Sequence, residues 1–243
     1  MIMQNNFKVA GIIQARMGSS RFPGKTLSKI KGLSCLKFLF ERIKESELDN
    51  IIVVTSDQPI DRQIIDLCND IGINNFAGSE RNVFSRIFQA LNKIDCDYFL
   101  RITGDDILLD SEVINYFIEQ INLYCPDFIS SFESKTYPNG LVMSGFKKNI
   151  FISAYRNSLS SFYKEHVIPY FLDNKVLFNY LSLQAPKDFL GFGINLAIDH
   201  PADLTKVDLV FGNDLLNQSA KSIISKIKSN SHLREMFADG AVY

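Results

Sequence analysis

The chain has 243 residues, 46% of them hydrophobic and 22% charged, which is the balance of a globular protein with a buried core. A formal net charge of −1 argues against general binding to nucleic acids or to a membrane surface. Because the sequence has no apolar run of roughly 18 residues, no leader-type start and no clustered cysteines, we expect a cytoplasmic protein with free thiols.

The first half of the chain alternates strand patterns with helix patterns. Apolar runs bounded by turn residues predict buried strands at residues 7–15, 50–56 and 97–103, with a short extended piece near Asn75. Apolar residues at helical spacing predict helices at residues 34–44, 59–71, 78–94 and 111–124, with Ser34 and Ser111 as N-caps. Strands and helices that alternate in this way form parallel βαβ units. We therefore predict an α/β fold in a single domain, residues 1–243, with a Rossmann-like, open, mostly parallel sheet and helices on both faces.

The alternation becomes less regular after about Phe132. The pattern there predicts a strand or hairpin at 136–146, two helices within 149–174, a strand at 176–184, and helices beginning near Pro201 and Ser219. We expect the last of these helices to pack back onto the sheet or onto a partner. Residues 133–190 are interpreted as an inserted lid or dimerisation segment that completes the substrate site.

A loop rich in glycine, serine and cations follows the first predicted strand. Residues 12–26 read IIQARMGSSRFPGKT, and the first forty residues contain seven lysines and arginines but no acidic residue. Ligands of open parallel sheets bind at the carboxyl ends of the strands, where this loop lies. Glycines allow backbone N–H groups to approach phosphate oxygens, and arginine matches phosphate with two parallel hydrogen bonds. The loop therefore indicates a site for a small polyanion such as a nucleoside triphosphate.

Two familiar phosphate-binding motifs fit the loop poorly. A P-loop places four residues between its two glycines, whereas Gly18 and Gly24 enclose five, and Pro23 removes an amide donor. A dinucleotide-binding loop has the pattern G-x-G-x-x-G, which is missing, and two arginines are excessive for a pyrophosphate held at a helix N-terminus. A triphosphate-binding loop of a nucleotidyltransferase remains.

The stretch IIQARMGSSRFPGKTL resembles the signature of cytidylyltransferases that activate acidic sugars, the acylneuraminate and deoxy-octulosonate types, and above all their relatives assigned to spore-coat polysaccharide biosynthesis. The likeness continues, in family order, in RITGDD (101–106), YPNG (137–140), KEHVIPY (164–170) and AIDHPADL (197–204). The resemblance implies a nucleotide-diphospho-sugar transferase type of fold. It also implies Mg²⁺-dependent transfer of CMP from CTP to a small acidic sugar or similar acceptor, in surface polysaccharide or glycoconjugate synthesis, by a homodimer.

Carried onto this sequence, the resemblance also assigns roles to single residues. The expected catalytic residues are Arg16, Lys25 and Asp105, and the expected Mg²⁺ ligands are Asp105 and Asp199. The expected nucleotide-binding residues are Ala15, Arg16, Gly18, Ser20, Arg21, Lys25, Gly78, Ser79, Thr103 and Gly104. The expected acceptor-binding residues are Tyr137, Asn139, Glu165, His166 and Asn195.

Some of these residues also have a purely structural interpretation. Asp199 stands where it can cap the helix that begins near Pro201, and Gly78 and Ser79 can form a turn and a helix N-cap. His166 can be a partly buried, hydrogen-bonded residue. Asp203 is expected to support a helix N-terminus.

The sequence departs from the family pattern around the expected acceptor site. Ile107 replaces a proline, Val142 and Ser144 replace two carboxylates, and Asn195 replaces an arginine. These exchanges change the charges that an acceptor can meet, so the acceptor is left open. Two other functions are also left open: a glycosyltransferase that holds a metal with Asp105 and Asp106, and a homologue without activity that binds a partner.

Overall fold

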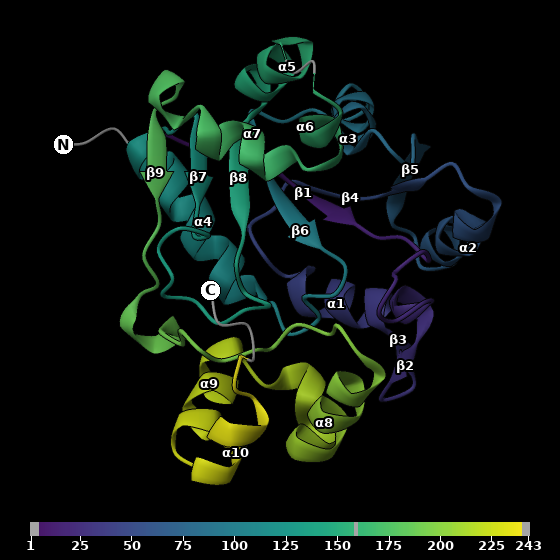
Figure 1. Cartoon of the computed structure of the whole chain (residues 1–243), viewed down its shortest axis with the longest axis vertical. Coiled ribbons are helices and arrows are strands. Elements are labelled where there is room, and N and C mark those ends of the chain that lie inside the picture. The colour runs from purple at the N-terminus through teal and green to yellow at the C-terminus, as the bar shows by residue number, and fades with distance from the viewer. Residues whose placement is uncertain (1–4, 158–159, 240–243) are drawn as a thin grey trace.

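The computed structural model describes residues 5–157 and 160–239. Its centre is a sheet of seven strands in the order β5-β4-β1-β6-β8-β7-β9, which is the predicted α/β architecture (Figure 1). The strands are β1 (Val9–Gln14), β4 (Asn50–Ser56), β5 (Asn74–Gly78), β6 (Tyr98–Thr103), β7 (Phe128–Ser130), β8 (Ser144–Lys147) and β9 (Tyr180–Ser182). A separate two-stranded ribbon consists of β2 (Lys29–Ile30) and β3 (Leu33–Ser34).

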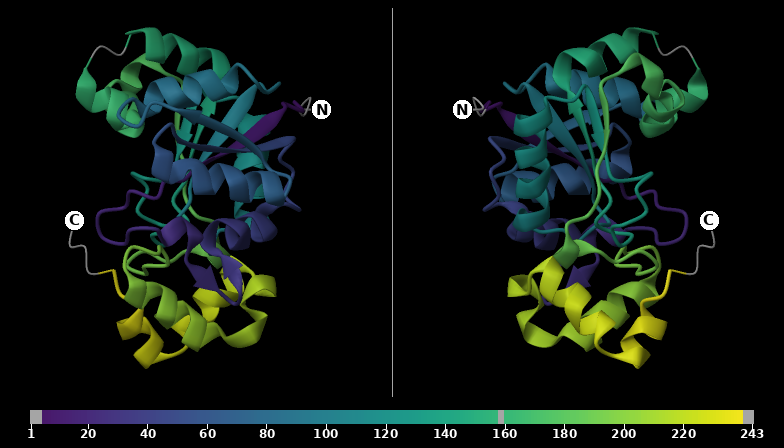
Figure 2. Two further views of the ribbon diagram at one scale, coloured as in Figure 1. Left: turned by 90° about the vertical axis from the view of Figure 1, so that its right-hand side faces the viewer. Right: turned by 90° about the vertical axis from the view of Figure 1, so that its left-hand side faces the viewer.

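Helices cover both faces of this sheet and also form a layer at one end of it (Figure 2). The helices are α1 (Cys35–Ile43), α2 (Arg62–Asp70), α3 (Val83–Leu91), α4 (Ser111–Tyr124), α5 (Lys148–Asn157), α6 (Ser161–Glu165), α7 (Val167–Asp173), α8 (Pro201–Phe211), α9 (Ala220–Lys228) and α10 (Ser231–Met236). Within the described ranges, no helix combines the length and the apolar character needed to cross a bilayer.

Strand β1 shows how the sequence pattern builds the two layers. Successive side chains of a strand point to opposite faces. Val9 and Ile13 accordingly pack in the core that contains α1, α2 and α4, whereas Ala10 and Ile12 pack in the core that contains α3, α5 and α7. All four are fully buried, as expected for a central parallel strand covered on both faces.

Strand order also determines where a ligand can bind. Strand β1 pairs in parallel with β4 on one side and β6 on the other, so the chain reverses its direction of travel across the sheet beside β1. At such a switch point, the connections after the two strands diverge and leave a crevice at the carboxyl ends. The loop that begins at Arg16 and the segment after Thr103 meet there.

The sheet is less regular on its other side. Strand β8 runs antiparallel to both β6 and β7, and β9 joins β7 in parallel, so residues 133–190 contribute two strands to the main sheet. Three helices, rather than two, lie between residues 148 and 173. The N-cap of α4 is Asp110 instead of Ser111: its Oδ1 accepts from the N–H of Val113, and an ionised carboxylate is the better acceptor.

The C-terminal helices form their own layer at the carboxyl end of the sheet (Figure 1). Helix α9 packs against α10 and against a short turn at Lys187–Phe189. Its buried residues Ile223 and Ile227 belong to the same hydrophobic core as α1 and α4. A hydrogen bond of 2.5 Å from the N–H of Ala220 to Asp110 Oδ2 attaches this helix to the start of α4. One carboxylate therefore caps two helices.

Candidate active site

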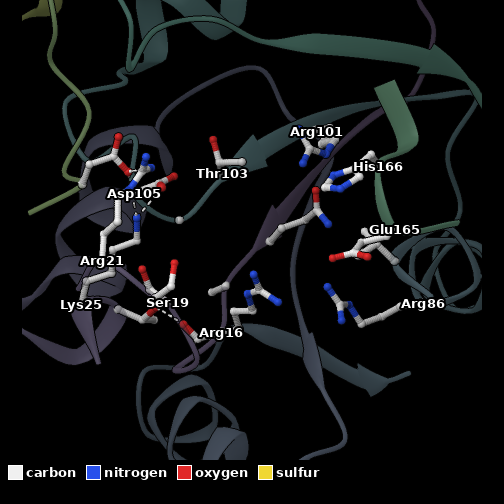
Figure 3. A pocket seen from close by; sticks show the side chains of 17 residues that line it. Arg16, Ser19, Arg21, Lys25, Arg86, Arg101, Thr103, Asp105, Glu165 and His166 are labelled. Carbon is white, nitrogen blue, oxygen red and sulfur yellow. Dashed lines mark hydrogen bonds and ion pairs between the residues drawn. The ribbon is translucent and has the colours of Figure 1, made fainter. Parts of the chain in front are cut away.

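A cleft of about 390 Å³ lies at the carboxyl ends of β1 and β6 (Figure 3). Its walls come from the loop after β1, the end of β6, helix α3, the junction of α6 and α7, and the segment before α8. Five of its lining side chains are arginine or lysine and three are aspartate or glutamate. The cleft is therefore polar and carries an excess of positive charge.

The cation-rich loop is fixed by its own backbone. The carbonyl of Met17 accepts hydrogen bonds from the N–H groups of Ser19 and Gly24, both at 2.9 Å, which closes the loop on itself. Gly24 has a φ of 76°, a left-handed conformation that glycine adopts without strain. Asp61, 2% exposed, accepts from the N–H of Met17 at 2.7 Å and is itself held by the hydroxyl of Ser56. The loop is thus pre-formed: its cationic and serine side chains line the cleft, whereas Met17 and Phe22 pack against the core.

Lys25 connects the loop to the opposite wall. Its Nζ lies 2.5 Å from Asp105 Oδ2, 3.0 Å from the carbonyl of Ile198 and 3.7 Å from Asp199 Oδ1. Arg21 Nη2 lies 2.5 Å from the same oxygen of Asp199. Two cations and two anions therefore alternate in one array of ion pairs. The paired residues are 80 to 178 positions apart in the sequence.

The structural interpretation of Asp199 as a helix cap does not hold. The N-cap of α8 is His200, with Pro201 in the first turn. Asp203 Oδ2 accepts from the N–H groups of Asp199 and His200, at 3.0 and 2.8 Å, which confirms its expected support of the helix N-terminus. Because Asp203 satisfies these donors, the side chain of Asp199 is directed toward Arg21 and Lys25 instead.

The two adjacent aspartates after β6 have different environments. Asp105 lines the cleft, whereas Asp106 is 8% exposed and accepts a short hydrogen bond from the hydroxyl of Thr103. Burial, reinforced by the charge of Asp105, raises the pKa of Asp106 to about 8. A pair of carboxylates that hold a metal together, as a glycosyltransferase would need here, is not formed.

The cleft brings together most of the residues expected from the sequence. They are Ala15, Arg16, Ser20, Arg21, Lys25, Thr103, Gly104, Asp105, Glu165, His166 and Asp199. Glu165 ends α6, His166 is the N-cap of α7, and both are exposed. His166 is therefore not the partly buried residue of the structural interpretation. Its ring lies 5.0 Å from that of Phe162.

Six expected residues, all within the described part of the chain, lie outside this lining: Gly18, Gly78, Ser79, Tyr137, Asn139 and Asn195. Gly78 ends β5, and Ser79 Oγ accepts from the N–H of Asn82, so these two residues form a turn. The N-cap of α3 is Asn82 itself, so the expected cap at Gly78 and Ser79 is wrong. Tyr137 is 3% exposed and packs near Phe117. Asn139 donates to Asn195 Oδ1 at 3.1 Å, so the two amides bind each other.

The structure adds two arginines that the sequence reasoning did not assign. Arg86, from α3, is 3% exposed and donates from Nη1 to the carbonyls of Ser79 and Glu80. Arg101, from β6, lies toward the same end of the cleft as His166 (Figure 3). The sequence contained a signal for both residues: Arg101 interrupts an apolar strand pattern, and Arg86 lies on the apolar face of a helix pattern. Buried charges are rare without a partner or a function.

Two carboxylates in the cleft have the chemistry of magnesium ligands. Mg²⁺ is held by one or two carboxylates together with phosphate oxygens and water, and Asp105 and Asp199 both contact the Lys25 ammonium group. In the described residues there is no group of three or more histidines, cysteines, aspartates and glutamates that would form a metal site without a ligand. The donor set therefore fits a metal that arrives with a nucleotide.

This sheet order, with a cation-rich loop at the switch point, defines a nucleotide-diphospho-sugar transferase type of α/β protein. A model described as cytidylyltransferase matches residues 10–229. The chain therefore belongs to the cytidylyltransferase family and is a CTP-using nucleotidyltransferase.

Individual relatives match this chain over nearly its whole length. An uncharacterized protein of Methanocaldococcus jannaschii is 35% identical over 94% of both chains. The spore coat polysaccharide biosynthesis protein SpsF of Bacillus subtilis is 28% identical over 90% of this chain and 93% of its own length. The solved structure of a cytidylyltransferase from Leptospira borgpetersenii, 25% identical, superimposes with a TM-score of 0.85 and covers 98% of this chain and all of that one.

Proposed function

We propose that this enzyme transfers CMP from CTP to a small acidic sugar or sugar-like acceptor, depends on Mg²⁺, and releases pyrophosphate. The observation that carries the proposal is the array in which Lys25 and Arg21 face Asp105 and Asp199 across one cleft. The cations have the charge that a triphosphate needs, and the carboxylates have the chemistry that its metal needs. Family membership supplies CTP as the nucleotide.

Before a nucleotide binds, these four side chains neutralise one another. Lys25 is 13% exposed and contacts both aspartates, so it stabilises two nearby carboxylates that would otherwise repel each other. In the proposed complex, Lys25, Arg21 and the exposed Arg16 turn their donors to the phosphates. Asp105 and Asp199 would hold Mg²⁺, which supplies charge stabilisation for phosphate oxygens in such sites.

The transfer follows from this placement. A hydroxyl oxygen of the acceptor forms a bond to the α-phosphorus, the bond from that phosphorus to the oxygen of the β-phosphate breaks, and the hydroxyl proton passes to water. Lys25 and Arg21 stabilise the negative charge that grows on the departing pyrophosphate. Arg16 orients the triphosphate from the other side of the loop. CMP remains attached to the acceptor oxygen.

The name of the Bacillus subtilis relative supports a place in surface polysaccharide or glycoconjugate synthesis. A cytoplasmic homodimer would fit this role. Val176 and Leu177, 91% and 69% exposed, lie just before the edge strand β9 and offer an apolar surface for such a contact. Light scattering of the purified protein tests the dimer.

Pyrophosphate release tests the proposed reaction. The wild type is incubated with Mg²⁺, each of the four nucleoside triphosphates, and a panel of acidic sugars. We expect release with CTP and at least one acceptor, and at least about tenfold slower release with Lys25→Ala. If neither release nor Mg²⁺-dependent CTP binding occurs with the folded wild type, the proposal is wrong. CTP binding without release from any acceptor would instead support a homologue that binds without catalysing.

A further inference from the structure

Arg42 is a buried cation on α1 that does not line the nucleotide cleft. Its side chain is 1% exposed, and its Nη2 lies 3.8 Å from Asp110 Oδ2, which is too far for a hydrogen bond. All five hydrogen bonds that this side chain forms among the described residues go to backbone carbonyls. A buried guanidinium is costly unless its donors have partners, so these carbonyls determine where it lies.

The first group of carbonyls belongs to the segment that carries Asp105. Arg42 donates from Nε to the carbonyl of Leu109 at 3.2 Å and from Nη2 to that of Leu108 at 3.0 Å. These two buried leucines follow the aspartates of the cleft almost directly, and the N–H of Leu109 donates to the carbonyl of Asp106 at 3.0 Å. Because the chain is so short and so closely turned here, a shift of the leucine carbonyls would also shift Asp105.

The second group of carbonyls follows the C-terminal end of α8. The Nη1 atom of the same guanidinium donates to the carbonyls of Leu215, Leu216 and Gln218, at 3.1, 3.1 and 2.7 Å. The two leucines belong to a short helical turn at Gly212–Asn217. Gln218 Nε2 donates in turn to the carbonyl of Phe211, the last residue of α8, at 3.0 Å. The guanidinium therefore holds the end of α8 that lies away from Asp199.

The same two segments are joined a second time, at the other end of α8. There the N–H of Ile198 donates to the carbonyl of Asp105 at 3.1 Å. Asp199 follows Ile198 directly and precedes the N-cap of α8. One joint alone would allow the segments to turn against each other. Because Arg42 supplies a second joint behind the first, the backbones that carry Asp105 and Asp199 have a fixed relative position.

From this arrangement we infer that Arg42 is a positioning residue for the metal, which fixes the separation of the Asp105 and Asp199 carboxylates by binding the backbone behind each of them. The inference rests on the proposed function, since it concerns the Mg²⁺ ligands of that reaction. Mg²⁺ requires nearly ideal octahedral geometry, so a displaced carboxylate holds it less well. Residues that orient the ligands can therefore change metal affinity without touching the metal.

Calorimetry of CTP binding with and without Mg²⁺ tests this role independently of turnover. In the wild type, Mg²⁺ should raise the affinity for CTP. Arg42→Met removes every donor, so this gain should fall at least about tenfold, whereas metal-free binding should not weaken because the cations of the loop after β1 are untouched. Arg42→Lys can still reach one group of carbonyls and should lose less. With Ca²⁺, whose coordination geometry is flexible, the loss should also be smaller.

A purely structural role for Arg42 predicts a different result. It would lower stability, and with it the fraction of molecules that bind, but not the affinity of the folded molecules, and calorimetry measures stoichiometry and affinity separately. Phe151→Leu, at a fully buried residue of the opposite core, is the control for lost stability. It should lower the urea midpoint and leave the gain from Mg²⁺ unchanged. If the Arg42 variants behave like Phe151→Leu, the inference is wrong.

A second pair of variants leaves Arg42 in place and decides the question if its own variants do not fold. Gln218→Ala removes the hydrogen bond to the end of α8, so the gain from Mg²⁺ should decrease, though by less than in Arg42→Met. Asn217→Ala removes a hydrogen bond to Asp214 within the turn and should leave the gain unchanged. Equal results for the two variants overturn the inference alone. No gain from Mg²⁺ in the wild type removes the proposed function instead.

Discussion

The two ends of the nucleotide cleft differ in how their charges are satisfied. At one end, Lys25 and Arg21 are paired with Asp105 and Asp199 at distances down to 2.5 Å. At the other end, Arg86 and Arg101 are held by the fold, and the Nε atom of each is buried without a partner among the described residues. A ligand must displace existing ion pairs at the first end, whereas at the second it supplies the missing partner.

The two ends of the cleft therefore use their cations differently. At the first end, each cation is neutralised by a carboxylate when the cleft is empty, and it can bind a phosphate only when another cation takes its place beside that carboxylate. A guanidinium group whose Nε lacks a partner is less favourable in the free protein and favours an anion that fits. The first end is therefore suited to a nucleotide that brings its own cation, and the second to a simple anion.

The largest effect is expected from Asp105→Asn. Loss of the carboxylate that faces Lys25 removes a metal ligand, so turnover with MgCTP should fall by about a hundredfold or more. In the absence of Mg²⁺, the same variant should bind CTP as well as the wild type or better, because Lys25 is released from its ion pair. Calorimetry with and without Mg²⁺ measures both effects. Asp208→Asn removes a carboxylate from an ion pair with Lys31 outside the cleft and serves as the control.

Lys25→Ala should weaken the binding of CTP in the absence of Mg²⁺, which is the opposite of the effect expected for Asp105→Asn. Its removal weakens CTP binding with and without Mg²⁺ and lowers turnover at least tenfold, because the departing pyrophosphate loses a cation. Lys31→Ala, which breaks the Lys31–Asp208 ion pair, is the matched control. Similar metal-free affinities for the Asp105 and Lys25 variants would mean that their ion pair has no part in nucleotide binding.

The sequence predicted the paired end well and the unpaired end poorly. Arg21 and Lys25 occur in a short local motif after a recognisable strand, so their common location follows from the chain itself. Arg101 sits inside a strand whose apolar neighbours dominate the pattern, and its access to a cleft depends on the antiparallel strand β8. Nor could the sequence show that Asn139 and Asn195 bond to each other, since they are brought together by a loop contact.

The next largest effect is expected from a substitution at Gly140, which packs against the segment that carries Asp199. Gly140 has a φ of 90°, and a Cβ there would lie 2.5 Å from the backbone nitrogen of Ala197. Gly140→Ala should lower the free energy of unfolding by about 3 kcal/mol, through backbone strain and displacement of residues 196–199.

Gly32 provides the control for this substitution, because its φ is 80° but a Cβ would meet open space. Gly32→Ala should therefore lose only about 1 kcal/mol, the strain alone. Urea unfolding gives the stability of both variants, and CTP turnover should decrease only for Gly140→Ala. Equal stability losses would show that the loop adjusts, and that the position of Asp199 does not depend on this contact.

The smallest effect is expected from a substitution of Asp203, which holds the backbone of Asp199 at the end of the cleft that contains the ion pairs. Burial by itself raises the pKa of this carboxyl, but hydrogen bonds from the N–H of His200, from Lys206 and from the N–H of Asp199 together hold the pKa below its usual value. The carboxylate therefore stabilises the folded state fully above the unfolded pKa of about 3.9, and this contribution is lost as the pH falls through the lower folded value.

Asp203→Asn should lower the free energy of unfolding by about 1 kcal/mol near neutral pH, as for other losses of a helix cap. The difference from wild type should narrow as the pH falls below about 4 and through the lower folded pKa of Asp203, at which the wild-type carboxyl also becomes neutral. Asp214→Asn, at an exposed carboxylate that accepts from Asn217, is the control and should show neither effect. A stability difference that stays constant down to pH 3.5 would mean that the charge of Asp203 is irrelevant, and that the amide disturbs the loop through its shape. Because Asp203 fixes the backbone N–H of Asp199, the affinity for MgCTP should decrease together with stability, which links the cap of α8 to the paired end of the cleft.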